Sequence, residues 1–301
     1  MENKTLVIIT GPTASGKSAL AVEVAERLGC DIISADSRQI YKGLPIGTAS
    51  PSQAELMAVR HHFVGTLDLH DYFSAALFEE EVMRLLPQLW ADNDYAVMCG
   101  GSMMYIDAVT RGIDSLPTIS PAVRDEALAL FKSGGREAVI SRLQELDPEY
   151  LRNADLNNHK RLVHALEICL EAGVPCSSLL TGKAVKRPFR IVKMAIDWPR
   201  PELFARINER VDRMISLGLE REARSVYHLR HLNSLNTVGY KEMFAMFDGV
   251  MDRQTAIARI AKNTRVYAKK QLLWLSKDPS VHLLSPGPAM ADEAISIIQA
   301  R

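Results

Sequence analysis

The stretch Gly11-Pro-Thr-Ala-Ser-Gly-Lys-Ser18 constrains the fold more than any other feature of this chain. It matches the pattern GxxxxGK[ST], follows the apolar run 6–10 and leads into a helix predicted at about 17–28. In such a loop the glycines allow a tight turn, and the backbone N–H groups point at phosphate oxygens. Lys17 adds a positive charge, and the Ser18 hydroxyl can bind Mg²⁺. The sequence therefore predicts a phosphate site but leaves the phosphate compound open.

Short apolar runs alternate with helical segments through the first hundred residues. Strands are predicted at 6–10, 31–35 and 95–99, and a further helix at about 103–109. Apolar strands between helices indicate a parallel sheet that helices cover on both faces. Ligands of such sheets lie at the carboxyl ends of the strands. The phosphate loop, Asp36 and Gly100-Gly101 are all expected at this edge.

The pattern changes after about residue 117, where only helices are predicted before a strand at 191–197. The glycine pair Gly134-Gly135 and the Asp147-Pro148 step separate the helices predicted in this region, at 123–132, 136–146 and 159–171. The expected fold class is thus α/β, a P-loop NTPase-like parallel sheet core with an all-helical insertion domain. The expected domains are 1–117 with 191–301 for the core and its C-terminal helices, and 118–190 for the insertion.

The C-terminal part is predicted to be helical, with apolar and basic stripes at helix spacing. One helix has an apolar stripe from Leu203 to Met214 and a separate basic stripe of Arg206, Arg210 and Arg213. A later helix has a positive face of Lys262, Arg265 and Lys269. Such stripes are usually solvated, but near a phosphate site an arginine can also clamp a leaving diphosphate.

Charge is unevenly distributed along a chain of zero net charge. Residues 1–150 hold 12 Lys and Arg against 21 Asp and Glu, and residues 151–301 hold 24 against 15. Either the two halves attract each other within one fold, or the second half presents a basic surface. The four cysteines are scattered, and no apolar run approaches the ~20 residues of a membrane span. We expect a cytoplasmic protein with reduced thiols, no membrane partner and no disulfide.

Three further motifs have both a structural and a functional interpretation. Asp36 ends a predicted strand, so its carboxylate suits a Mg²⁺ ligand, a general base or a cap for the following turn. Ser102, in Gly100-Gly-Ser-Met-Met-Tyr105, suits either a helix cap or a substrate contact. His61-His62 are expected to have a structural role, because adjacent residues of a regular element cannot both face one metal ion.

Taken together, the motifs resemble the tRNA dimethylallyltransferases. GPTASGKS, DSRQIYKGLPIGTASP, HH, GGSMMY, TVGYKE and TRVYAKKQLLWL occur in that family's order and spacing, over nearly the whole chain. The resemblance implies transfer of a dimethylallyl group from dimethylallyl diphosphate to N6 of the adenine at tRNA position 37, beside the anticodon. Diphosphate leaves, and Mg²⁺ is the implied cofactor.

The resemblance also implies a role for particular residues. Asp36 would be the base, with Ser102 and Lys17 as further catalytic residues. The diphosphate would bind to the loop and to Arg206 or Arg210, with Mg²⁺ on Ser18; the loop residues are Gly11, Pro12, Thr13, Ala14, Ser15, Gly16, Lys17 and Ser18. The implied tRNA contacts are Asp36, Ser37, Arg38, Gln39, Ser102, Arg124, Asn157, Asn158, His159, Lys160, Arg161, Thr237, Gly239, Tyr240 and Lys241.

Recognition of tRNA would require the target base to leave its stack and enter a pocket. The helical insertion is then expected to grip the anticodon stem-loop, in a monomeric protein. Three rival functions remain at this point: a dimethylallyltransferase acting on free adenine nucleotides, a P-loop kinase using ATP, and an RNA-binding NTPase switch. Turnover with dimethylallyl diphosphate, compared with ATP or GTP, separates them.

Overall fold

The structure, a computed structural model, describes residues 3–114, 116–182 and 184–300. It divides into two compact units, one running up to Arg111 and resuming at Lys186, the other comprising residues 112–185. The expected insertion, 118–190, therefore starts and ends a few residues too late. Arg187 explains the later boundary, because its guanidinium pairs with Glu79 and donates to the carbonyls of Ala108 and Val109. These contacts tie the segment before the returning strand to the α/β unit.

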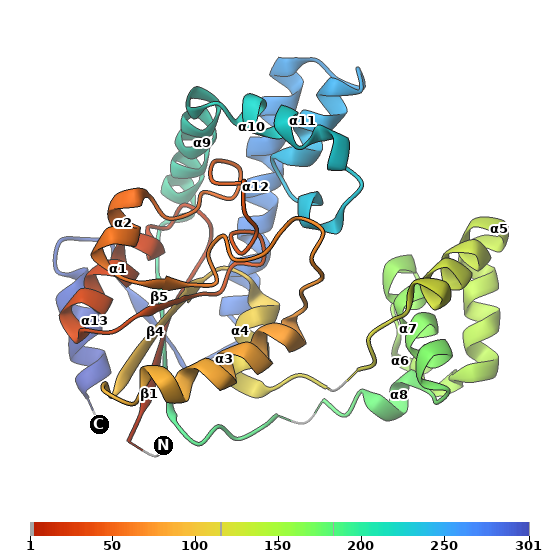
Figure 1. Ribbon diagram of the computed structural model, residues 1–301, viewed down its shortest axis with the longest axis horizontal. Coiled ribbons are helices and arrows are strands. Elements are labelled where there is room, and N and C mark those ends of the chain that lie inside the picture. The colour runs from red at the N-terminus through yellow and green to blue at the C-terminus, as the bar shows by residue number, and fades with distance from the viewer. Residues whose placement is uncertain (1–2, 115, 183, 301) are drawn as a thin grey trace. The chain divides into compact units, whose positions relative to one another are not determined.

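A six-stranded parallel sheet forms the centre of the first unit (Figure 1). Its order is β3-β2-β4-β1-β5-β6, so the strand before the phosphate loop is internal. The strands predicted in the first hundred residues and at 191–197 are confirmed, whereas the strands at each edge were not foreseen. The bounds are β1 Thr5–Thr10, β2 Ile32–Ser34, β3 His61–His62, β4 Tyr95–Gly100, β5 Arg190–Ile196 and β6 Val281–Leu284.

Alternate residues of the central strand pack under different helices. Val7 and Ile9 belong to a core with α1 (Lys17–Leu28) and α13 (Met290–Gln299). Leu6 and Ile8 belong to a second core with α3 (Ala75–Leu89) and α4 (Met103–Arg111). All four strand residues are fully buried. The sheet is thus covered on both faces, as its apolar strands require.

The C-terminal helices form a third core with the segment after β2 (Figure 1). Residues Ile40 and Leu44 of that segment pack against Val211, Leu235 and Tyr240. The predicted apolar stripe is confirmed, since Leu203, Ile207 and Val211 are buried. The remaining elements of this unit are α2 Gln53–Ala58, α9 Arg200–Leu217, α10 Leu219–Ser225, the 3₁₀ turns Tyr227–Leu229 and Asn233–Leu235, α11 Tyr240–Phe247 and α12 Arg253–Leu275.

The second unit is entirely helical in its described residues and has a core of its own. Its elements are α5 Pro121–Leu146, α6 Pro148–Asn153, α7 His159–Ala172 and α8 Cys176–Leu179. Gly135, at φ 66°, interrupts α5, so the chain forms two helical segments there as the glycine pair predicts. Throughout the described residues, no helix has the length and apolar composition needed to cross a membrane.

Candidate active site

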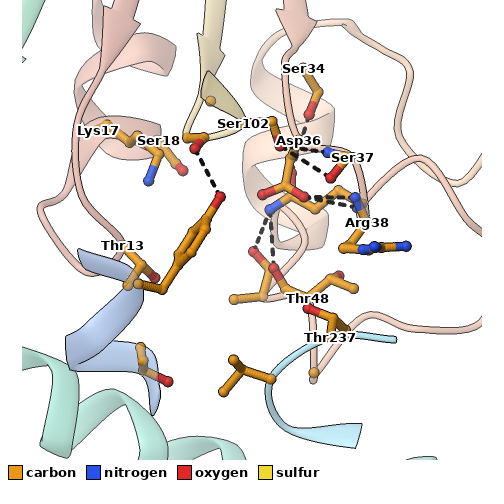
Figure 2. A pocket seen from close by; sticks show the side chains of 18 of the residues that line it. Thr13, Lys17, Ser18, Ser34, Asp36, Ser37, Arg38, Thr48, Ser102 and Thr237 are labelled. Atoms are coloured by element: carbon orange, nitrogen blue, oxygen red, sulfur yellow. Dashed lines mark hydrogen bonds between the residues drawn. The ribbon is translucent and has the colours of Figure 1, made fainter. Parts of the chain in front are cut away.

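A cavity of about 430 Å³ lies at the carboxyl ends of β1, β2 and β4. Figure 2 shows Lys17 and Ser18 on one side of it and Asp36 with Arg38 on the other. The cavity thus brings together motifs that lie far apart in sequence, with Thr13 and Gln271 separated by 258 residues. The lining includes Thr13, Lys17, Ser18, Asp36, Ser37, Arg38, Gln39, Thr48, Gly101, Ser102, Arg210, Thr237, Lys241, Tyr267 and Gln271.

The phosphate loop is held in a conformation that only a few residues adopt. Gly11 and Gly16 have φ of 140° and 94°, and Ala14 lies in the left-handed region at 65°. A non-glycine residue in that region is strained, which is common at functional sites. Gly16 begins α1 with no side-chain cap, so the helix presents free N–H groups to the cavity. This end of the helix suits an anion.

The phosphate loop contains a buried ammonium group, on Lys17, and a buried hydroxyl group, on Ser15. Burial lowers the pKa of Lys17, although Cys99 and Asp36 act to raise it. The Lys17 ammonium donates to the Pro12 carbonyl at 3.3 Å, its one hydrogen bond to the described residues. The Ser15 hydroxyl is buried and lacks a partner within the described part of the chain. A buried cation and a free buried hydroxyl both favour binding of an oxyanion.

The two candidate arginines on α9 have different positions. Arg210 lines the cavity, where burial lowers its pKa and the charge of Asp36 opposes that shift. Arg206 instead donates to the Ala14 carbonyl at 2.9 Å and stacks on Trp198, 4.4 Å from the ring centre. The Trp198 indole also donates to the Ser15 carbonyl at 2.8 Å. Arg206 therefore supports the strained loop, and Arg210 is the arginine of the two that lines the cavity.

Asp36 caps the turn after β2, and its carboxylate also lines the cavity, as a general base would have to. Its Oδ1 accepts hydrogen bonds from the backbone N–H groups of Arg38, at 2.9 Å, and Gln39, at 3.3 Å. The carboxylate thereby caps the turn after β2, yet it lines the cavity opposite the phosphate loop (Figure 2). A capped carboxylate has a fixed orientation, which suits a general base.

Ser102 is bonded to the turn that carries Asp36. Its hydroxyl accepts a hydrogen bond from the Ser37 N–H at 2.9 Å, and its own N–H donates to the Ala35 carbonyl at 3.1 Å. A Cβ on Gly100 would lie 2.1 Å from that carbonyl oxygen, so only glycine fits there. The Gly100-Gly101 pair thus allows the ends of β2 and β4 to approach closely.

The segment TVGYKE contributes to the cavity only in part. Thr237 and Lys241 line it, whereas Gly239 and Tyr240 are buried away from it. Tyr240 has no exposed surface, and its hydroxyl donates to Glu222 at 2.5 Å. The prediction that Gly239 and Tyr240 contact tRNA is therefore wrong for this structure, because packing removes both from any accessible surface.

Glu222, which the sequence did not single out, connects Tyr240 to the cavity wall. Its carboxylate accepts hydrogen bonds from the N–H groups of Ile46, at 2.8 Å, and Gly47, at 2.7 Å. The carbonyls of Thr48 and the next residue in turn accept from the Gln39 amide, at 3.2 and 2.9 Å. This network fixes the cavity wall formed by the GLPIGTAS segment.

Arg38 also has an internal role. Its guanidinium donates to the carbonyls of Asn233 and Ser234, at 2.7 and 3.2 Å. The histidine pair lies in β3, where His62 bonds Asp31 at 2.8 Å and His61 bonds the Val59 carbonyl. These contacts agree with a structural role for both histidines, and His61 also lines the cavity. Among the described residues, no group of three or more His, Cys, Asp or Glu is placed to hold a metal.

The helical unit holds the other candidate tRNA contacts, at opposite ends of α7. Residues 157–161 begin that helix, where Asn158 caps it and His159 stacks on Phe131 at 5.3 Å. Asn157 accepts a hydrogen bond from Arg136 at 2.9 Å. The start of α5, with Arg124, instead lies near the far end of α7, because Ser120 bonds Glu171 there. Arg124, Lys160 and Arg161 are exposed.

The Mg²⁺ implied by the sequence fits the residues present. Ser18 lines the cavity at the first turn of α1, and Asp36 provides a carboxylate across it. Mg²⁺ bound with phosphates usually takes one or two protein ligands and several waters. Ser18 and Asp36 are thus the residues that would hold the ion.

Comparison with known proteins decides the family. Residues 39–278 match the family model described as IPP transferase. The chain belongs to this family. The tRNA dimethylallyltransferase 2 of Parabacteroides distasonis is 50% identical over 282 residues, which cover 94% of each chain. Both the resemblance and the α/β fold expected from the sequence are thus confirmed.

Solved structures of IPP transferases share the architecture. The tRNA isopentenylpyrophosphate transferase of Bacillus halodurans has a TM-score of 0.71 and 32% identity, covering 98% of this chain and 94% of the other. A eukaryotic dimethylallyltransferase acting on tRNA has a TM-score of 0.80 over 94% of this chain and 74% of the other. At 22% identity, the second likeness concerns the fold alone.

Proposed function

We propose that this IPP transferase moves a dimethylallyl group from dimethylallyl diphosphate to N6 of the adenine at tRNA position 37, with release of diphosphate. The observation that best supports this function is that the phosphate loop and the Asp36 carboxylate line the same cavity. Relatives that match 94% and 95% of this chain are named tRNA dimethylallyltransferases, which supports both the acceptor and the donor. We further propose that the protein is cytoplasmic and acts as a monomer.

The reaction requires one bond to form and one to break. The N6 nitrogen attacks the first carbon of the dimethylallyl group while the carbon–oxygen bond to diphosphate breaks, and its electron pair leaves with the diphosphate. The amine loses a proton to Asp36, since an amine conjugated to the adenine ring is a weak nucleophile without a base. The capped orientation of Asp36 keeps its carboxylate at the cavity, where this proton is released.

The negative charge that develops on the leaving diphosphate needs preorganised donors. We assign this task to the N–H groups of the loop and of the first turn of α1, to the Lys17 ammonium and to Arg210. Arg206 acts indirectly, by holding the carbonyl of strained Ala14. When bound, Mg²⁺ would supply further charge neutralisation to the diphosphate, and Ser18 is its proposed ligand.

The acceptor has to present its base from the anticodon loop. The cavity opens beside exposed Lys241 and the half-buried Thr237, so these two side chains are proposed tRNA contacts. Ser37, Arg38, Gln39 and Ser102 form the adjoining wall, and we propose that they shape the adenine site. For the helical unit, we propose that exposed Arg124, Lys160 and Arg161 bind the phosphates of the stem-loop.

A labelling experiment tests this function against its rivals. The protein and Mg²⁺ are incubated with radiolabelled dimethylallyl diphosphate and either unmodified tRNA or a mixture of AMP and ATP. Label in tRNA alone is expected, and mapping should find it on the adenine beside the anticodon. Label in a free nucleotide would instead indicate a nucleotide-specific dimethylallyltransferase. No label in either acceptor would refute the proposed function and return attention to kinase or NTPase activity.

A further inference from the structure

The sequence segment TRVYAKKQ has no role in the chemistry described so far. It lies on α12, and its last residue, Gln271, is only 2% exposed. Burial of a polar amide is unfavourable unless both of its ends are hydrogen-bonded. The buried Gln271 amide is therefore expected to have a hydrogen-bond partner at each end.

Gln271 connects two loops of the cavity with the two ends of its amide. Its Oε1 accepts a hydrogen bond from the N–H of Thr13, in the phosphate loop, at 3.0 Å. Its Nε2 donates to the carbonyl of Gly101 at 2.9 Å. Tyr267, one turn earlier on α12, donates to the same carbonyl at 3.2 Å. The amide orientation is fixed, because each end faces a group of the complementary type.

The loop at Gly101 leads directly to the candidate base. Ser102 follows it, and the Ser102 hydroxyl accepts from the N–H of Ser37, which is next to Asp36. The loop at Thr13 belongs to the proposed diphosphate site. The chain of contacts therefore runs from the donor site, through Gln271, to the turn that carries Asp36.

A close contact at Gly101 shows how tightly this bridge is packed. A Cβ on Gly101 would lie 2.4 Å from Gln271 Nε2, whereas its next neighbour, the Gly11 carbonyl oxygen, would be 3.4 Å away. The backbone of Gly101 is not in the left-handed region, so alanine would be compatible with its conformation but would force the Gln271 amide to move. Glycine at this position lets the amide span the gap between the two loops.

We propose that Gln271 is a positioning residue that sets the distance between the donor diphosphate and the Asp36 base. This inference deepens the proposed function and rests on it. Transfer between two bound substrates depends steeply on their relative placement, and a misplacement of about 1 Å can cost 100-fold in rate. Loss of the bridge should therefore slow the transfer step while each substrate still binds.

The first test replaces Gln271 with leucine, which keeps the volume and removes both hydrogen bonds. The single-turnover transfer rate is expected to fall about 10- to 100-fold, while the Kd values for inorganic diphosphate and for unmodified tRNA stay within about threefold of wild type. Gln254→Leu is the matched control, since Gln254 is exposed on the same helix and is not among the residues that line the cavity. Wild-type transfer in Gln271→Leu would overturn the proposal, and so would a loss explained entirely by weaker binding.

A second variant covers the case in which Gln271→Leu does not fold. In Gln271→Glu the carboxylate can still accept from Thr13 but faces the Gly101 carbonyl without a proton to donate. Transfer is expected to fall by a similar factor when both proteins are compared at a temperature at which circular dichroism shows them to be folded, since the buried carboxylate should also lower the melting temperature. An unimpaired Gln271→Glu enzyme would show that the Gly101 half of the bridge does not position anything.

A double-mutant cycle separates positioning from a general packing role. Gly101→Ala should reduce transfer in the wild-type background, because its Cβ displaces the Gln271 amide. The same change should cost little more in a Gln271→Ala background, where the clash is absent. Additive losses would contradict a route through Gln271.

Hydrogen exchange gives a readout that does not depend on activity. The peptide that covers residues 11–16 should exchange faster in Gln271→Leu than in wild type or Gln254→Leu. If the wild-type protein transfers no dimethylallyl group, the proposed function fails, and unchanged exchange in Gln271→Leu separately refutes the bridge.

Discussion

Asp36 caps the turn after β2 and is also the proposed general base, so a substitution that tests the base has to preserve the cap. One carboxylate oxygen caps the turn after β2, and the side chain also lines the cavity opposite the phosphate loop. Removing the side chain would lose the cap together with the proposed base. Asparagine retains an oxygen for the cap but cannot take a proton, so it isolates the chemical role.

We predict that Asp36→Asn binds donor and tRNA almost normally but loses transfer by about 10²- to 10⁴-fold, the usual contribution of a general base. Rapid-quench measurement of single-turnover transfer, with separate binding titrations, tests this. Asp36→Ala should lose at least as much transfer and also unfold at lower temperature. A near wild-type rate in Asp36→Asn would remove Asp36 from the role of base.

Lys17 gives a prediction for pH. Its pKa is lowered mainly by burial in the unliganded protein, and a bound diphosphate should raise it. Binding then requires the protonated amine, so affinity for inorganic diphosphate falls as pH rises through the lowered pKa of Lys17. Isothermal titration from pH 7 to pH 10 measures this slope. Lys17→Arg does not titrate in this range and should show a flatter profile; equal slopes would exclude Lys17 as the source.

At the scale of elements, the carboxylate of Glu222 joins α10, α11 and the wall of the cavity. It accepts from two backbone N–H groups and from the Tyr240 hydroxyl. A Cβ on Gly47 would lie 2.4 Å from the Tyr240 ring, so the glycine in GLPIGTAS is needed for this packing. Tyr240, which the sequence analysis assigned to tRNA binding, thus supports the cavity wall through Glu222.

Glu222→Ala should lower the free energy of unfolding by about 1–3 kcal/mol, because it leaves buried donors without an acceptor. Urea denaturation measures the change. Glu220→Ala on the same helix is the control, since its ion pair with Arg253 is exposed and is expected to contribute about 0–1 kcal/mol. Equal effects from the two variants would show that the Glu222 contacts add no special stability.

Helices and strands with strong apolar periodicity or a sequence motif were predictable. Short strands that form only because they pair with the edge of an existing sheet were not. The phosphate loop, α1 and β4 carry local signals that agree with the fold. By contrast, β3 has two residues and β6 is a partly exposed edge strand, so neither has the apolar run of an internal strand. The cavity residues were largely predictable from motifs, whereas Glu222 and the contacts of Gln271 depend on helices that are distant in sequence.

At the scale of the whole molecule, the basic excess of the second half lies outside the helical unit. Residues 112–185 contain 8 Lys and Arg against 10 Asp and Glu, whereas residues 186–301 contain 20 against 12. Residues 1–111 of the same unit hold 8 Lys and Arg against 14 Asp and Glu, so the α/β unit as a whole is nearly neutral and its basic excess is confined to the C-terminal segment. Salt-dependent tRNA binding should accordingly depend on α9–α12 as much as on the helical unit.

A buried ion pair links the end of α12 to the sheet. Lys193, in β5, donates to Asp278 at 2.6 Å, and the side chains are 8% and 11% exposed. Burial by itself would raise the pKa of Asp278, but hydrogen bonds from Lys193 and Ser280, with the Lys193 charge, lower it to about 2. The pair therefore contributes stability above the ordinary carboxyl pKa and loses it as pH falls through the lowered one.

We predict that wild type and Asp278→Asn differ in unfolding free energy by an amount that shrinks by on the order of 1–2 kcal/mol between about pH 4 and pH 2. The sign follows from the depressed pKa of the folded state, since the carboxylate binds its proton more readily after unfolding. Denaturant titrations at a series of pH values test it. A difference that stays constant across this range would show that the ion pair is not coupled to folding.

The strand order has a consequence for synthesis on the ribosome. The first strand made, β1, is internal, and one of its two neighbours, β5, begins at Arg190 and is synthesised only after the whole helical unit. The helical unit has its own core and can fold earlier, whereas the phosphate loop is not held by a complete sheet until β5 pairs with β1. Arrested chains that end before Arg190 should therefore be cut readily by protease around residues 11–18, and longer chains should become resistant.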